Sequence, residues 1–139
     1  MLIIILSLSA SFGMFLSFNY KSFGFHEIHD DKYMSFIGIC ASLVNGFSRL
    51  LWGVLLDKYS FKTITTIINC VLLVGCIVVD YAVSNKVAYL ILVCIVYGCF
   101  AGNYSIYSPM TYKIVGKVLG SKVYFLTYFG FSMGILLYY

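Results

Sequence analysis

Long apolar stretches separated by short polar breaks run along the whole chain. Each stretch is close to the roughly 20 residues that an α-helix needs to cross the hydrocarbon core of a bilayer. Spanning strands are a poor alternative, because the stretches do not alternate between apolar and polar residues and exceed the about 9–11 residues of a barrel strand. The pattern predicts an all-α integral membrane protein, a single transmembrane domain over residues 1–139 with five transmembrane helices at about 1–19, 34–56, 63–83, 87–109 and 121–139.

The composition agrees with a multi-pass membrane location. The chain is 62% hydrophobic and 10% charged, whereas soluble domains average about 45–50% apolar and about 25% charged residues. The net charge is +4, but the basic residues are scattered among short loops and form no cluster or stripe of the kind that nucleic acid needs. The lipid bilayer is therefore the expected partner, and nucleic acid is not.

The polar breaks predict where the helices end. Residues 20–33 should form a solvated loop in which Asp30 or Asp31 caps the following helix. Residues 57–62 should lie in water, and the Ser-Asn-Lys sequence at 84–86 predicts a tight turn between antiparallel helices. Pro109 should end or bend the fourth helix, because proline lacks a backbone donor, which would make 110–122 a basic loop.

The distribution of charge predicts which side of the membrane each loop occupies. Cytoplasmic loops carry an excess of lysine and arginine. If successive loops lie on alternate sides of the membrane, one side carries five lysines: Lys58, Lys62, Lys113, Lys117 and Lys122. The other side carries three lysines and three acids: Lys21, Lys32, Lys86, Glu27, Asp30 and Asp31. We therefore expect the 57–62 turn and the 110–122 segment to be cytoplasmic, or on the equivalent side of an organelle membrane.

The chain's single arginine, Arg49, lies inside the second apolar stretch. A charge at the centre of a membrane helix costs roughly 2.5–3.5 kcal/mol on insertion scales, so it usually faces a polar cavity or a partner. Small and polar residues recur with it at helical spacing, which predicts one small, polar face: Gly38, Ser42, Asn45, Arg49 and Gly53. Ser42, Asn45 and Arg49 are the candidate substrate-binding residues. The alternative for Arg49 is snorkelling to the interface or bonding to a neighbouring helix's carbonyls.

Other residues suggest packing rather than chemistry. Gly98 and Gly102 form a small-xxx-small pattern, which favours close helix contact. The five cysteines lie in apolar stretches without CxxC spacing and are interpreted as packing residues. His26 and His29 invite a zinc hypothesis, yet they lack the HExxH spacing, and a capping loop is preferred. We expect no metal, no cofactor and no catalytic residues, because no apolar stretch supplies paired acids or a base with a nucleophile.

The turn after Arg49 resembles a known family. The sequence Gly53-x-x-x-Asp57-Lys58-x-x-x-Lys62 is similar to the cytoplasmic loop signature of major facilitator superfamily transporters, with Ser60 and Phe61 as departures from it. The stretch from Asn45 to Gly53, and GCFAGNYSIYSP in the fourth run, look most like the oxalate/formate exchanger and monocarboxylate porter branch. The resemblance implies that the five predicted helices correspond to helices seven to eleven of a twelve-helix transporter, within its C-terminal half.

The resemblance also implies a function. In that branch the arginine of the eighth helix contacts the substrate carboxylate, a role that would fall to Arg49, with the Gly53–Lys62 motif as a conformational loop. Proton-coupled porters carry an aspartate where this chain has Asn45, and the second cation of dicarboxylate exchangers is matched by the uncharged Phe131. The expectation is a carrier for a small organic anion, a monocarboxylate, working with a missing N-terminal half. The alternative is a small membrane packing subunit or scaffold.

Overall fold

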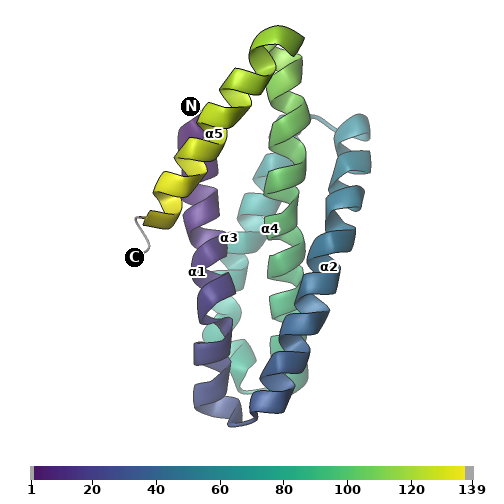
Figure 1. The fold of residues 1–139 in the computed structure, drawn as a ribbon. Coiled ribbons are helices and arrows are strands. Elements are labelled where there is room, and N and C mark those ends of the chain that lie inside the picture. Colours follow the sequence, from purple (N-terminus) through teal and green to yellow (C-terminus); the bar gives the residue numbers. More distant parts are fainter. Residues whose placement is uncertain (1, 137–139) are drawn as a thin grey trace.

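A computed structural model describes residues 2–136 of the chain. The helices alternate in direction and are joined by linkers of one or two residues (Figure 1). Their bounds are α1 (Leu2–Ile28), α2 (Asp31–Lys58), α3 (Phe61–Val83), α4 (Lys86–Val115) and α5 (Lys117–Leu136). The all-α prediction is confirmed. Among the described residues, α2, α3 and α4 are long and apolar enough to cross a membrane; that α1 and α5 also cross stays a prediction.

The fourth helix is the centre of the bundle. Although α2 and α3 are neighbours in sequence, they hardly touch each other, and both pack against α4. On the other side α5 crosses α1 and also rests on α4, while α3 lies behind (Figure 1). Most of the buried residues of α4 are apolar or small, and they extend along its length from Tyr89 to Thr111. Every other helix therefore contacts this central element, and α1 and α5 also pack against each other.

The predicted loop at 20–33 is wrong in extent. Helix α1 continues to Ile28, and only His29 and Asp30 separate it from α2. Packing explains the extra turns: Gly24 is buried, and a Cβ there would lie 2.6 Å from the sulfur of Met34 and 2.7 Å from the ring of Tyr89. The predicted cap is confirmed, since the Asp30 carboxylate accepts from the backbone N–H of Tyr33 at 3.1 Å.

The predicted basic loop at 110–122 is also wrong. Helix α4 runs through Pro109 to Val115, and α5 starts at Lys117. Proline removes one helical hydrogen bond, but the turn around it is held by the Thr111 hydroxyl, which donates to the carbonyl of Tyr107 at 2.8 Å. The helix ends at Gly116, whose φ of 85° suits glycine best. The turn at 84–86 lies where it was predicted, with Asn85 capping α4.

Close approach of α2 and α4 explains the two glycines of the fourth run. A Cβ on Gly98 would lie 2.9 Å from the Ser48 hydroxyl, and one on Gly102 would lie 2.6 Å from Ile68 and 2.9 Å from the indole of Trp52. The Trp52 indole N–H donates to the carbonyl of Gly98 at 2.8 Å. In lipid, where apolar burial does not drive helices together, such small-residue contacts and interhelical hydrogen bonds hold the bundle.

Gly102→Leu should disrupt this contact. Extra carbon atoms in a well-packed interface cost about 1–3 kcal/mol, so the substitution should lower the stability of the folded bundle against denaturing detergent and shift the fluorescence of Trp52, the chain's single tryptophan. Gly46→Leu on the open face of α2 is the matched control, because nothing lies within 4 Å of a Cβ there. Equal losses for the two variants would contradict the assigned packing.

Candidate functional site

Arg49 lies well inside the length of α2. It is nine residues before the C-terminal Lys58 of α2 and eighteen after the N-terminal Asp31, about 14 Å and about 27 Å along the helix axis at 1.5 Å per residue. Arg49 is therefore nearer the C-terminal end of α2 but still within the apolar length of the helix. A charge there needs a polar environment, either between the helices or at the interface that a long side chain can reach.

The polar face of α2 lies between a buried face and an apolar exposed one. Met34, Ala41 and Ser48 face α4 and are buried, whereas Phe47 and Leu50 are 70% and 71% exposed on the outer face. Ser42 and Arg49 are exposed along the border between the two faces, and Asn45 is half-buried. The polar stripe thus follows the edge of the α2–α4 contact rather than the outer, lipid-like surface.

The Arg49 guanidinium turns towards α4. Its central carbon lies over the ring of Tyr104 at 5.5 Å from the ring centroid, a cation–π contact. No carboxylate of the described chain lies within ion-pair distance of Arg49. The acidic side chains all lie at or near helix ends: Glu27, Asp30, Asp31, Asp57 and Asp80. Arg49 is therefore held by an aromatic face, which leaves its charge without a fixed counter-ion in the chain.

An aromatic wall extends from Tyr104 to the last helix. The rings of Tyr104 and Tyr128 have centroids 6.2 Å apart, Tyr124 and Tyr128 lie 4.7 Å apart, and Phe100 packs edge-on against Tyr104 at 5.2 Å. Sequence reasoning did not assign these residues. The signal was present in the spacing of Tyr124 and Tyr128, which are four residues apart and so share one face of α5.

The other predicted binding residues are placed differently. The Asn45 amide donates to the carbonyl of Tyr97 at 3.0 Å, so it ties α2 to α4 one turn before Arg49. Ser42 lines a separate cavity of about 510 Å³ between α1 and α2, whose other lining residues include Tyr20, Gly38 and Tyr97. The structure therefore brings Asn45 and Arg49 to the same stretch of the α2–α4 edge and places Ser42 nearer the opposite end.

The resembled loop motif forms a tight turn at the end of α2. Asp57 and Lys58 are exposed in its last turn, and Lys62 is exposed in the first turn of α3. Between them Ser60 caps α3, accepting from the N–H of Thr63 at 3.2 Å. Gly53 faces open space, with nothing within 4 Å of a Cβ. The side chain of Phe131 is not among those that the structure describes.

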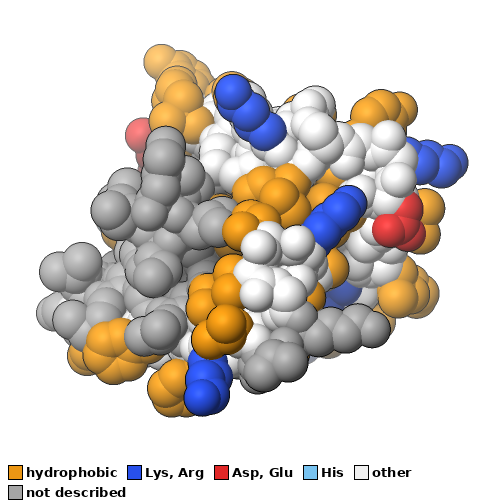
Figure 2. Space-filling view, turned by 90° about the horizontal axis from the view of Figure 1, so that it is seen from above, with side chains coloured by type: hydrophobic (Ala, Val, Ile, Leu, Met, Phe, Trp, Pro, Cys, Tyr) orange, Lys and Arg blue, Asp and Glu red, His pale blue; other side chains and the backbone are white. Residues whose placement is uncertain are grey.

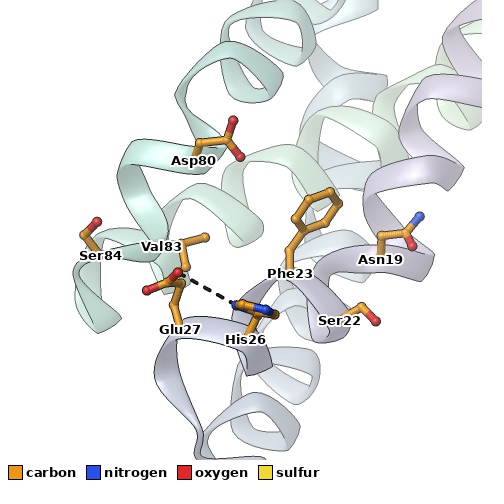
Figure 3. A pocket seen from close by; sticks show the side chains of 8 residues that line it. All are labelled: Asn19, Ser22, Phe23, His26, Glu27, Asp80, Val83 and Ser84. Atoms are coloured by element: carbon orange, nitrogen blue, oxygen red, sulfur yellow. Dashed lines mark ion pairs between the residues drawn. The ribbon is translucent and has the colours of Figure 1, made fainter.

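A second cavity, of about 550 Å³, lies at the opposite end between α1 and α3 (Figure 3). His26 and Glu27 project from α1 with 3.9 Å between the imidazole and the carboxylate, and Asp80 projects from α3 across the opening. The second histidine of the zinc hypothesis, His29, stacks on Phe25 with centroids 6.2 Å apart. Within residues 2–136 no three histidine, cysteine or acidic side chains gather closely enough to hold a metal ion.

Comparison with known proteins does not identify the chain. No family model, no curated protein and no solved structure matches it.

Thiol labelling tests whether the polar face of α2, which carries Ser42 and Arg49, is exposed to water. With the five native cysteines replaced, Ser42→Cys and Arg49→Cys should react with a charged methanethiosulfonate in proteoliposomes about tenfold faster than Phe47→Cys and Leu50→Cys, because only hydrated thiols ionise and react. Phe47 and Leu50 are 70% and 71% exposed on the outer face of α2 and serve as the matched pair. Equal rates at all four positions would show that the stripe faces the same surroundings as its neighbours.

Proposed function

We propose that the chain is part of a secondary carrier that moves a small monocarboxylate across a membrane by alternating access. The observation that carries the proposal is Arg49, a cation inside an apolar helix that lies over the Tyr104 ring and has no acidic partner among the described residues. A charge within a membrane span is tolerated when something compensates it. In a carrier the compensating group is the anionic substrate itself.

The chemistry of the guanidinium suits a carboxylate. Its planar fork of donors matches the two carboxylate oxygens, and its flat face stacks on aromatic rings. The guanidinium carbon lies over the Tyr104 ring, 5.5 Å from its centroid, so an aromatic ring rather than a carboxylate is the contact seen in the chain. A single cation at this depth favours a substrate with one negative charge over a dianion.

The arrangement of helices supports a site on one side of the bundle. Arg49, Tyr104 and Tyr128 come from α2, α4 and α5, while α3 lies behind (Figure 1). We infer that this side meets a second helical half, as in transporters whose substrate site lies between two repeats near the bilayer midplane. This assigns the helices to positions seven to eleven of a twelve-helix major facilitator carrier, with the N-terminal half as the partner.

The alternative of a packing subunit has weaker support. For a packing subunit the sequence points to Gly98, Gly102 and the serines of the first apolar run as the interface. Both glycines, however, lie within the chain's own contact between α4 and its neighbours α2 and α3. An acid on another chain could still pair with Arg49, in which case the arginine would stabilise an assembly rather than select a substrate. Transport measurements separate these two roles.

Arg49→Lys and Arg49→Ala should both abolish most uptake of labelled monocarboxylate by the full-length protein. Losing a desolvated charged partner costs about 2–5 kcal/mol, so Arg49→Ala should reduce uptake by more than 30-fold. Arg49→Lys should lose tenfold or more, because lysine cannot offer a bidentate fork. Leu50→Ala, the neighbouring position on the outer face, is the control for expression and folding. Wild-type uptake by Arg49→Lys would contradict bidentate recognition, and absence of uptake by the wild type would favour the packing subunit.

Asn45→Asp should weaken uptake over the whole range from about pH 8 to pH 5. The new carboxylate, one turn before Arg49, is ionised at neutral pH and would neutralise the guanidinium, so anion binding should fall. An aspartate carboxyl has an ordinary pKa of about 3.9, and a neighbouring guanidinium lowers that pKa further, so the charge and the loss of uptake should persist at about pH 5. Asn45→Leu also loses the bond to Tyr97 but adds no charge, so its loss of uptake should be smaller. Equal losses for Asn45→Asp and Asn45→Leu would place Arg49 out of reach of that position.

A further inference from the structure

The two ends of the bundle carry opposite charge. At the end formed by the α2–α3 and α4–α5 junctions, five lysines stand against one aspartate, a net charge of +4: Lys58, Lys62, Lys113, Lys117, Lys122 and Asp57. At the other end three lysines stand against four acids, a net charge of −1: Lys21, Lys32, Lys86, Glu27, Asp30, Asp31 and Asp80. We refer to the first as the basic end and to the second as the acidic end.

Two of the three lysines at the acidic end, Lys21 and Lys86, have partners within the chain. The Lys21 ammonium lies 2.8 Å from the Asp31 carboxylate, and this hydrogen bond and charge raise the pKa of Lys21. Lys86 lies 4.0 Å from Asp30 and 5.7 Å from the ring centroid of Tyr33. These contacts join α1 to α2 and α2 to α4, so the charged side chains at this end stabilise contacts between helices of the chain itself.

Lysines at the basic end have no such partners. No ion pair joins Lys58, Lys62, Lys113 or Lys122 to an acid within the described part of the chain, and all four side chains are exposed. Figure 2 looks down on this end and shows the basic side chains spaced apart, with uncharged and apolar side chains between them. A compact anion needs cations that converge on one point, whereas a layer of headgroups meets cations spread over a surface.

We propose that the basic end binds the anionic headgroups of membrane lipids, such as phosphatidylglycerol or phosphatidylserine. The apolar spans α2, α3 and α4 begin or end there, which places these lysines at the depth of the lipid headgroups. Long lysine stems can lie along apolar surface while the ammonium reaches the interface. Each lysine near an anionic surface favours binding by about fivefold at moderate ionic strength. The proposal does not depend on the carrier function.

Spin-labelled lipids measure this preference directly. With the chain in phosphatidylcholine bilayers, electron spin resonance gives the association constant of spin-labelled phosphatidylglycerol relative to spin-labelled phosphatidylcholine for lipids that touch the protein. Averaged over all contact positions, we expect about a two- to threefold preference at low salt that falls towards one at high salt. Because both leaflets have the same composition, the orientation of the inserted chain does not affect the result.

Matched variants assign the preference to one end. The fourfold substitution of Lys58, Lys62, Lys113 and Lys122 by glutamine should remove most of it, while Lys21→Gln with Lys86→Gln, whose ammonium groups already face acids of the chain, should lower it much less. Helix content and Trp52 fluorescence report whether each variant is folded; if the fourfold variant does not fold, Lys58→Gln and Lys122→Gln tested singly should each lower the preference. Equal preference in the two sets, or no preference in the wild type, would overturn the proposal. Selective competition by inorganic phosphate at constant ionic strength would also overturn it, since it would indicate a site for a soluble anion.

Discussion

The close contact between α2 and α4 is the interaction on which the rest of the structure depends. Gly98 and Gly102 remove the side chains that would hold the two backbones apart, and Ser48 and Trp52 of α2 occupy the space so released. Two side chains of α2 then donate to consecutive carbonyls of α4, Asn45 to Tyr97 and Trp52 to Gly98. Hydrogen bonds of this kind fix the rotation and register of α2 on α4 as well as the distance between them. In an apolar membrane few other interactions distinguish one register from another.

That register determines the surroundings of Arg49. Asn45 and Trp52, one turn before it and nearly one turn after it, are both tied to α4, so the arginine between them is held at the edge of the contact. Its guanidinium reaches the ring of Tyr104 rather than the outer face where Phe47 and Leu50 lie. A rotation of α2 by a single residue, about 100°, would carry the charge onto the apolar face. The packing glycines and the candidate binding residue are thus parts of one arrangement.

Hydropathy was enough to predict the number and class of the helices, because a run of about 20 apolar residues has few other structures open to it. It failed where polar residues continue a helix. Residues 20–28 are helical because Gly24 packs against Met34 and Tyr89. A contact between helices cannot be predicted from the residues next to it in the sequence. Hydropathy also placed a boundary at Pro109, whereas α4 continues to Val115 and ends before Gly116. Arg49 could be singled out by its cost in an apolar run, whereas the ring facing it comes from a residue 55 positions away, which spacing alone cannot locate.

The charges at the two ends bear on how an anion would reach Arg49. From the basic end the arginine lies about 14 Å along α2, behind a set of unpaired lysines, whereas from the acidic end it lies about 27 Å away, behind a surface of net negative charge. Fields from such charges raise or lower the local concentration of a charged solute before it binds. The same lysines interact with anionic headgroups, which would screen part of that field. In a carrier of the proposed kind, attraction of a soluble anion and attraction of the lipid surface would compete at the basic end, and the lipid composition of the facing leaflet would affect how strongly Arg49 binds an anion.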